Sequence, residues 1–567
     1  MDNDSFTSIY QPLPRTGMTR ILCLDPSAKG DQLAGRLEYI DLERPSQYEA
    51  LSYVWGDNDK EHIIQIEGRS IAITFSLFSA LKDLRHESQN RRIWADAICI
   101  NQNDLEEREQ QVSIMGTIYR AASRVVTYIG PESEDSSAAI QFGRELIKFH
   151  ILNPVKDPRL HLPNEVHHIG LPPISDPRWQ ALKSLLLRGW SGRSWCAHEF
   201  VMNKTLLIMC GKVEVRPWAF LVDIVCLVVN RDLPVFLVPT DEEDSNCLRE
   251  CLRAIGRLRL FVAGTDRKVP LLSLLIASHP LKASDPRDKI YSLLGLAQDR
   301  ETYAVPVDYT CSAESLYTLV GGRIISISKS TDLLYSNITK KSMQLPSWVP
   351  DWSTWQFGSD GSSYYFDYIA CGDTSPNVEV DGDRLHLTGS LIDKVSWIDD
   401  TNIGAFYSYP LVPGRDAWLV EMMKVAQQSE QYNHEKSDVL WRTLIGNITL
   451  EGKRATDVYW SHYYAHFTLT EESPLEQQTL AREYCDAARR RSRYRRLCAT
   501  ETGYFGAIPE TAQVGDWICM LEGSRLLFTL RQKGGHFLLV GPAYTHGLMH
   551  DEALQLDSYK RRVFTLV

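Results

Sequence analysis

The sequence has little that would hold the chain in a membrane or cross-link it outside a cell. Its longest apolar run, Trp218–Val229, is interrupted by Asp223, and a membrane span needs about 20 apolar residues. The first residues have neither a basic segment nor an apolar core, so we expect no secretory signal. The 12 cysteines include no CxxC pair, which predicts neither a disulfide framework nor a zinc site. We therefore expect no membrane span, no bound metal, reduced thiols and a cytoplasmic location.

Several short catalytic signatures are also missing. The sequence contains no GxGxxG, GxxxxGK[ST], HExxH or GxSxG motif, which removes the common nucleotide-binding, zinc-protease and hydrolase readings. What is present is the composition of an ordinary globular protein, with 567 residues, 44% hydrophobic and 23% charged. The net charge of −11 argues against a general polyanion binder, so we expect no nucleic-acid partner.

The first third of the chain alternates between strand-like and helix-like segments. Glu49–Trp55, Ile93–Ile100 and Arg124–Ile129 have the apolar, β-rich pattern of buried strands. Residues 62–74 flank a glycine and predict a hairpin, and Phe75–Leu84 has helical periodicity. This alternation predicts an α/β sandwich with a mostly parallel sheet.

The expected secondary structure differs between two further regions of the chain. Residues 212–335 have a mainly helical pattern, and residues 336–567 mix strands and helices. Short strand patterns at 378–397 and 514–545 predict one small antiparallel β unit, which a helical insertion at 413–500 splits. We therefore expect an N-terminal domain at 1–211, a helical region and a C-terminal α+β region.

Two charged residues lie where apolar residues are expected. Arg108 falls on the apolar stripe of a helix that starts near Asp104, and Glu199 has Trp195 one turn before it and Met202 one turn after it. A buried charge must be paired. Desolvation would also raise the pKa of Glu199 and suit it to acid–base chemistry or to binding a polar ligand. An equally good interpretation is a buried ion pair between Arg108 and either Glu199 or Asp96, without any chemistry.

Polar residues follow two of the predicted strands, at the strand ends where ligands bind in open α/β sheets. Each of them taken singly is an ordinary core or turn residue, whereas the cluster as a whole predicts a binding site. These residues are Ser52, Tyr53, Trp55 and Gly56 after the first strand, and Asp96, Asn101 and Gln102 after the second.

Other candidates have weaker signals. His198 is next to Glu199, but neighbouring helical residues point about 100° apart. Cys196 has no evident base, so we expect a buried structural thiol. The six arginines of Arg489–Arg496 predict a solvated helical face. The Tyr544–Met549 segment, which includes a histidine, has the pattern of ordinary strand and loop residues.

Four segments resemble the fungal heterokaryon-incompatibility (HET) domain, in the same order and over about residues 48–211. Later segments, including Asp285–Ala297 and Leu345–Ser353, are similar to the regions that often follow that domain. The four segments are Tyr48–Asp57 (YEALSYVWGD), Ser76–Arg85, Ile93–Gly130 and Arg193–Phe200 (RSWCAHEF).

The resemblance implies both a fold and a function. HET domains act in non-self recognition and cell death of fused fungal cells, and their fold is related to the TIR domain, some members of which cleave NAD⁺. It therefore implies a TIR-like sandwich, with NAD as substrate and no required cofactor. Glu199, in RSWCAHEF, would be the catalytic glutamate that contacts the nicotinamide ribose or stabilises the oxocarbenium-like transition state, and Trp195 would line the pocket. Arg108, Asp96 and His198 are further site candidates from the residue pattern. Partners would be other incompatibility proteins or a second copy of the HET domain.

Two other functions remain open from the sequence. A cofactor-independent isomerase, cyclase or lyase of fungal secondary metabolism would use the same pocket, with Glu199 and either His198 or Asp96 as acid–base groups. A non-catalytic signalling scaffold would need no chemistry at these residues.

Overall fold

The computed structural model describes most of the chain in two compact units, Met1–Ser312 and Ala313–Val567. No helix among these described residues is long and apolar enough to cross a bilayer. The apolar run at 218–229 falls mostly outside the description. The described residues are 9–29, 31–44, 46–56, 59–153, 166–203, 205–215, 220, 223–224, 227, 250–258, 269–336, 341–354, 368–403, 415–428, 431–432, 438–470 and 473–567.

The first unit is built on a nine-stranded sheet with the order β5-β4-β2-β1-β6-β3-β7-β8-β9. The strands are β1 (Met18–Leu24), β2 (Ala34–Asp41), β3 (Glu49–Tyr53), β4 (His62–Ile66), β5 (Arg69–Ile73), β6 (Arg91–Trp94), β7 (Arg124–Tyr128), β8 (Leu206–Cys210) and β9 (Val213–Val215).

The sheet is mixed rather than mostly parallel, which corrects the sequence-based expectation. Its four central strands, β6-β3-β7-β8, are parallel to one another. The hairpins β1–β2, β4–β5 and β8–β9 are antiparallel, and so is the β1–β6 pair. The parallel strands are the ones with continuous apolar runs. β1 and β2 precede the segment with the clearest sequence pattern, and for this reason they were missed.

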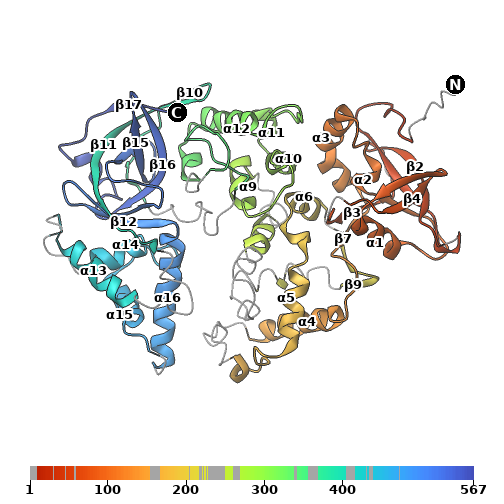
Figure 1. Ribbon diagram of the computed structural model, residues 1–567, viewed down its shortest axis with the longest axis horizontal. Coiled ribbons are helices and arrows are strands. Elements are labelled where there is room, and N and C mark those ends of the chain that lie inside the picture. Colours follow the sequence, from red (N-terminus) through yellow and green to blue (C-terminus); the bar gives the residue numbers. More distant parts are fainter. Residues whose placement is uncertain are drawn as a thin grey trace. The chain divides into compact units, whose positions relative to one another are not determined.

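Helices pack against this sheet and against one another. Figure 1 shows α4 and α5 side by side, and α6 contacts both β3 and β7 in the parallel centre. The helices of this unit are α1 (Phe75–Leu84), α2 (Asp96–Cys99), α3 (Leu105–Ala121), α4 (Ser136–Leu152), α5 (Pro177–Leu186), α6 (Ser194–Met202), α9 (Leu271–Ser278), α10 (Asp288–Leu294) and α11 (Arg300–Tyr303).

The predicted strand at Ile93–Ile100 is too long. β6 ends at Trp94, and the chain turns into α2 at Asp96. The Asp96 carboxylate accepts a hydrogen bond from the Ala97 backbone N–H (2.8 Å), and the N–H groups of the next two residues donate to the Ala95 carbonyl. These local bonds replace the strand pairing, and they leave Asp96 at the carboxyl end of β6.

A buried ion pair ties the first strand to α3. Asp104 caps α3 by accepting a hydrogen bond from the Glu107 backbone N–H (3.1 Å). The Glu107 side chain does not complete a capping box, because it accepts hydrogen bonds from the guanidinium of Arg20 (2.5 and 2.9 Å) and from the Asn101 N–H. Arg20 is 0% exposed, so this pair links β1 to the helix that follows the site strands.

The second unit contains an eight-stranded sheet that closes on itself. β11 pairs with both β12 and β14, so β11-β12-β13-β16-β15-β14 form a ring of the barrel type. The strands are β10 (Val378–Asp381), β11 (Arg384–Ile398), β12 (Arg495–Thr500), β13 (Phe505–Pro509), β14 (Trp517–Leu521), β15 (Leu527–Lys533), β16 (His536–Thr545) and β17 (Arg562–Leu566). The predicted small β unit is therefore too small, because it lacks β12, β13 and β17.

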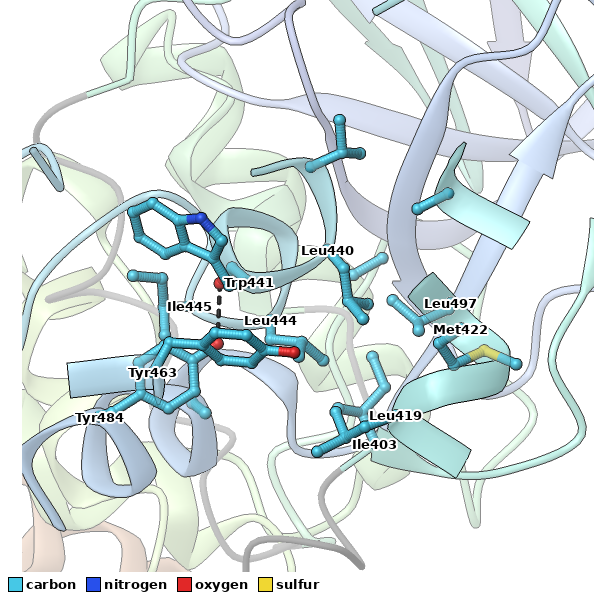
Figure 2. Packing of buried hydrophobic residues seen from close by; sticks show 14 of the residues in the cluster. Ile403, Leu419, Met422, Leu440, Trp441, Leu444, Ile445, Tyr463, Tyr484 and Leu497 are labelled. Carbon is cyan, nitrogen blue, oxygen red and sulfur yellow. Dashed lines mark hydrogen bonds between the residues drawn. The ribbon is translucent and has the colours of Figure 1, made fainter. Parts of the chain in front are cut away.

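The helices between β11 and β12 enclose an apolar core with these strands. Figure 2 shows Met422, Leu440, Trp441 and Leu497 in this core, together with Tyr484, whose hydroxyl donates to the Trp441 carbonyl (2.8 Å). The helices of this unit are α12 (Ala313–Ser328), α13 (Arg415–Gln427), α14 (Val439–Leu444), α15 (Trp460–Phe467) and α16 (Leu475–Ser492).

Removing the Glu107 carboxylate should unfold the first unit much more easily. Glu107→Ala leaves the buried Arg20 charge without its ionic partner, which costs about 3–5 kcal/mol. Urea unfolding measures this loss in the free energy of unfolding. Glu106→Ala, at the exposed neighbouring position, introduces the same helix-favouring residue and should change it by less than about 0.5 kcal/mol. Equal effects of the two substitutions would contradict a stabilising ion pair.

Candidate functional site

Glu199 is the centre of a buried polar cluster where α6 crosses the parallel strands. Its side chain is 3% exposed and accepts a short hydrogen bond from the Ser52 hydroxyl on β3. The Ser52 oxygen in turn accepts a hydrogen bond from the indole N–H of Trp190 (2.8 Å). The Tyr119 hydroxyl, which donates to the Leu51 carbonyl (3.1 Å), also lies within hydrogen-bonding reach of Glu199. Strand, loop and helix thus fix one carboxyl group.

This carboxyl group is poised to hold or release a proton near neutral pH. Burial raises the pKa of Glu199 from its ordinary 4.5 to about 7, against the opposing effects of the Arg193 charge and the Ser52 hydrogen bond. The negative charge of Asp96 adds to the increase. A carboxyl with such a pKa can act as acid, base or charge stabiliser in the physiological range.

Asp96 is the second carboxyl group of the cluster and lies closer to solvent. It is half-buried and accepts hydrogen bonds from the Tyr53 hydroxyl (3.0 Å) and the Trp55 indole (2.8 Å). Burial raises the pKa of Asp96, while the charge of Arg193 and these two donors oppose the increase. The structure brings Tyr53, Trp55 and Asp96 together at one end of the sheet, where the sequence predicted a cluster.

Arg193, rather than Arg108, is the cation of this cluster. Arg193 is half-buried, donates to the Tyr53 carbonyl, and interacts electrostatically with both Glu199 and Asp96. Arg108 instead stacks on the ring of Tyr309 (3.8 Å to the centroid) and lies 4.0 Å from the Asp285 carboxylate. The ion pairs expected between Arg108 and Glu199 or Asp96 are therefore not formed.

His198 and Trp195 lie on another side of α6. The His198 ring packs so closely on α3 and on the end of α10 that a methyl group added to Gly295 would lie 2.4 Å from its Nε2 atom, and one added to Gly116 3.0 Å. Neither ring nitrogen has a hydrogen-bond partner among the described residues, and burial lowers the pKa of His198 to about 3. The ring of Trp195 lies 5.9 Å from that of His198, and its indole bonds the Asp288 carboxylate.

The remaining predicted residues have mainly structural contacts. The Asn101 carboxamide oxygen accepts a hydrogen bond from the Asn103 N–H (3.3 Å), which is a turn contact. The Gln102 carboxamide donates to the Asp96 carbonyl (3.0 Å) and so steadies the turn that carries Asp96. Gly56 is exposed, with φ +71°, a conformation that favours glycine. Burial raises the pKa of Cys196 well above its usual range, so this group is a neutral thiol.

The described residues include no group of three or more histidine, cysteine or acidic side chains arranged to hold a metal ion. Each of the ten described cysteines is a free thiol. The cluster itself contributes two carboxyl groups, the Arg193 charge and the hydroxyl groups of Ser52 and Tyr119 around Glu199.

Two family descriptions match this chain. Residues 48–199 match the family described as "Heterokaryon incompatibility protein (HET)". The N-terminal part of the chain, which carries the polar cluster, is thus similar to HET domains. Residues 407–567 match the family described as "Het-6 beta-barrel domain", in agreement with the closed ring of strands in the second unit.

One curated relative aligns with nearly the whole chain. "Heterokaryon incompatibility protein 6, OR allele" of Neurospora crassa is 26% identical, over 99% of this chain and 98% of its own length. No solved structure matches the chain.

The HET segment contains every member of the polar cluster. Ser52, Asp96, Tyr119, Arg193 and Glu199 all lie within residues 48–199. Tyr119 and Arg193 were not predicted as members of the cluster, although Arg193 is the first residue of the segment RSWCAHEF that carries the resemblance. Arg193 immediately precedes α6, and from there its guanidinium donates to the Tyr53 carbonyl at the end of β3.

The high pKa of Glu199 makes the HET domain less stable as the pH rises. The folded protein binds the Glu199 proton more tightly than the unfolded chain, so this contribution is fully present below pH 4.5 and is lost as the pH rises through about 7. Glu199→Gln cannot ionise. Between pH 4.5 and pH 8 the wild type should lose roughly 3 kcal/mol of unfolding free energy relative to Glu199→Gln.

Urea unfolding at a series of pH values measures this difference. Glu106→Gln, which replaces an exposed carboxylate, serves as the control and should follow the wild type across the range. If Glu199→Gln and the wild type had the same pH dependence, the elevated pKa of Glu199 would be contradicted.

Proposed function

We propose that this protein acts in heterokaryon incompatibility, as an effector of cell death after fungal cells with different genotypes fuse. The main support is the alignment with heterokaryon incompatibility protein 6 over 98% of that relative, which extends through both units. The HET domain adds to this support. We place its action in the cytoplasm, in association with other incompatibility proteins or a second copy of its own HET domain.

We further propose that the HET domain is TIR-like and cleaves NAD⁺ at the bond between nicotinamide and ribose, with Glu199 as the catalytic residue. In that reaction the C–N bond breaks, nicotinamide leaves with the bonding electrons, and water adds to the ribose carbon with loss of a proton. The transition state resembles an oxocarbenium ion, which a nearby carboxylate stabilises. The observation that carries this proposal is the buried Glu199 carboxyl, whose pKa of about 7 leaves a large fraction ionised at neutral pH.

The other polar residues would support the same reaction. Ser52 orients the Glu199 carboxyl by donating a hydrogen bond to it, and Tyr119 lies within hydrogen-bonding reach. The half-buried Asp96 and Trp55 provide polar and aromatic surface that a substrate can reach. His198 is not suited to act with Glu199, because its ring packs against Gly116 and Gly295. This placement weakens the alternative of a tailoring enzyme in which the two residues form an acid–base pair.

Loss of the Glu199 carboxylate should abolish both toxicity and NAD⁺ loss. Expression of the wild type in a fungal host should slow growth and lower cellular NAD⁺, and Glu199→Gln should do neither. Growth rate and NAD⁺ content are measured in the same cultures. The expected fall in the rate of NAD⁺ cleavage is at least about 100-fold, as for other groups that stabilise transition-state charge.

The experiment needs a control variant, a check of protein amounts and a statement of the contradicting outcomes. Glu106→Gln, outside the cluster, should behave as the wild type. Equal amounts of the variants in the cells exclude loss of the protein as the cause. Toxicity that persists in Glu199→Gln with normal NAD⁺ would overturn the enzymatic proposal and favour a signalling scaffold, and a wild type without any effect on growth would contradict the incompatibility role.

A further inference from the structure

The second unit contains a cavity of about 450 Å³, remote in sequence from the HET segment. Its walls come from the end of β16 with the loop that follows it and from the segment after α14. A volume of this size is typical of sites for small ligands. The Tyr544–Met549 segment, for which the sequence predicted only ordinary strand and loop residues, lines this cavity.

The cavity contains two arginines with different surroundings. The Arg442 guanidinium donates to the Asn447 side chain (2.9 Å) and the Ala455 carbonyl (2.7 Å), and pairs with the exposed Asp457. These contacts hold it as part of the wall. The Arg454 side chain is exposed and makes no hydrogen bond or ion pair within the described part of the chain. One cation of the cavity is therefore fixed by the protein, and the other is available to a ligand.

Aromatic rings form another part of the wall. The Tyr368 ring lies 6.1 Å from that of Tyr544 and 6.2 Å from that of His550. The Tyr544 hydroxyl hydrogen-bonds the Nδ1 atom of His546 (3.1 Å). The Tyr432 hydroxyl donates to the His546 carbonyl (2.9 Å), and this bond holds the backbone of the Tyr544–Met549 segment in place. These contacts give the cavity a preformed aromatic surface.

The charges around His546 favour an anionic occupant. Burial, and then the positive charge of Arg442, lower the pKa of His546 to about 4. Arg454 acts in the same direction, whereas the negative charge of Asp438 opposes both. The imidazole is therefore neutral at pH 7. Of the charged residues in the wall, Asp457 pairs with Arg442 and Glu552 accepts a hydrogen bond from the His550 N–H, so the exposed Arg454 is the cation that a bound anion would compensate.

We propose that this cavity binds a small anion that carries a planar ring. Arg454 contacts the anionic group, which is a phosphate or a carboxylate, and the ring lies against the Tyr368 and His550 side of the wall. Arginine is well suited to either anion because its planar guanidinium donates two parallel hydrogen bonds. The site is independent of the chemistry proposed at Glu199, since all its lining residues belong to the second unit.

Isothermal titration of the full chain tests this proposal with four probes. AMP and benzoate combine a ring with a phosphate or a carboxylate, whereas inorganic phosphate and adenosine each carry one half of the required chemistry. AMP or benzoate should bind at least about tenfold more tightly than inorganic phosphate or adenosine. Which of the two binds more tightly identifies the anionic group.

Arg454→Ala should weaken binding of the preferred probe about tenfold, the effect of losing one charge-assisted contact. Lys453→Ala removes the same charge from the adjacent exposed position, which does not line the cavity, and should change the affinity less than twofold. Arg454→Lys should recover part of it. The proposal would be overturned if neither AMP nor benzoate bound. It would also be overturned if Arg454→Ala and Lys453→Ala lost equal amounts of binding affinity. Adenosine binding as tight as AMP would overturn the role of the anion.

Discussion

The hydrogen bond from Ser52 to the buried carboxyl of Glu199 is the contact on which the N-terminal site depends. It joins the central strand β3 to α6, and the Ser52 oxygen also accepts a hydrogen bond from the indole of Trp190, in the short 3-10 helix Gly189–Gly192 before α6. A carboxyl group that is 3% exposed is costly to bury unless it is hydrogen-bonded or protonated, and this one is both hydrogen-bonded and shifted toward the protonated form. The same burial that makes Glu199 chemically useful therefore imposes a pH-dependent cost on the fold.

The sequence was sufficient to predict Glu199 and to place Ser52 and Asp96 in the candidate site, but not to identify the cation beside them. Glu199 could be identified because its neighbours one turn away are apolar, a pattern that a single helix contains. The identity of the neighbouring cation depends on how α6, α3 and β3 meet. Arg108 lies on an apolar stripe of α3 and was the natural candidate, yet the stripe at that point faces Tyr309. Arg193 has no periodic neighbours that indicate burial, and only the packing of its loop brings it to Asp96 and Glu199.

The same distinction holds for the fold. The hairpin at 62–74, the helix at Phe75–Leu84 and the strand that begins at Arg124 were predicted from local patterns and are present. The eight-stranded sheet was underestimated because strands such as β12 look unlike strands locally. β12 begins at Arg495, within the arginine-rich segment that predicts a solvated helix. Arg495 is 8% exposed and donates to the Ala507 and Pro542 carbonyls of neighbouring strands. A buried arginine that satisfies backbone carbonyls cannot be distinguished from a solvated one by composition.

The net charge of −11 has little bearing on either site, because the arginines close to each site determine its local potential. Salt largely screens exposed charges that lie farther than about 8–10 Å from a ligand, so the nearby charges decide the potential at a site. At Glu199 the nearest cation, Arg193, is itself partly neutralised by Asp96, so burial dominates and the carboxyl keeps its proton more readily. At the cavity of the second unit Arg442 pairs with Asp457 and lies 3.6 Å from Asp438, whereas Arg454 is exposed and has no ion pair within the described part of the chain. An acidic protein can therefore present one site that favours a neutral or cationic group and another that favours an anion. Whether the arginines of a site are paired with carboxylates determines which kind of charge that site favours.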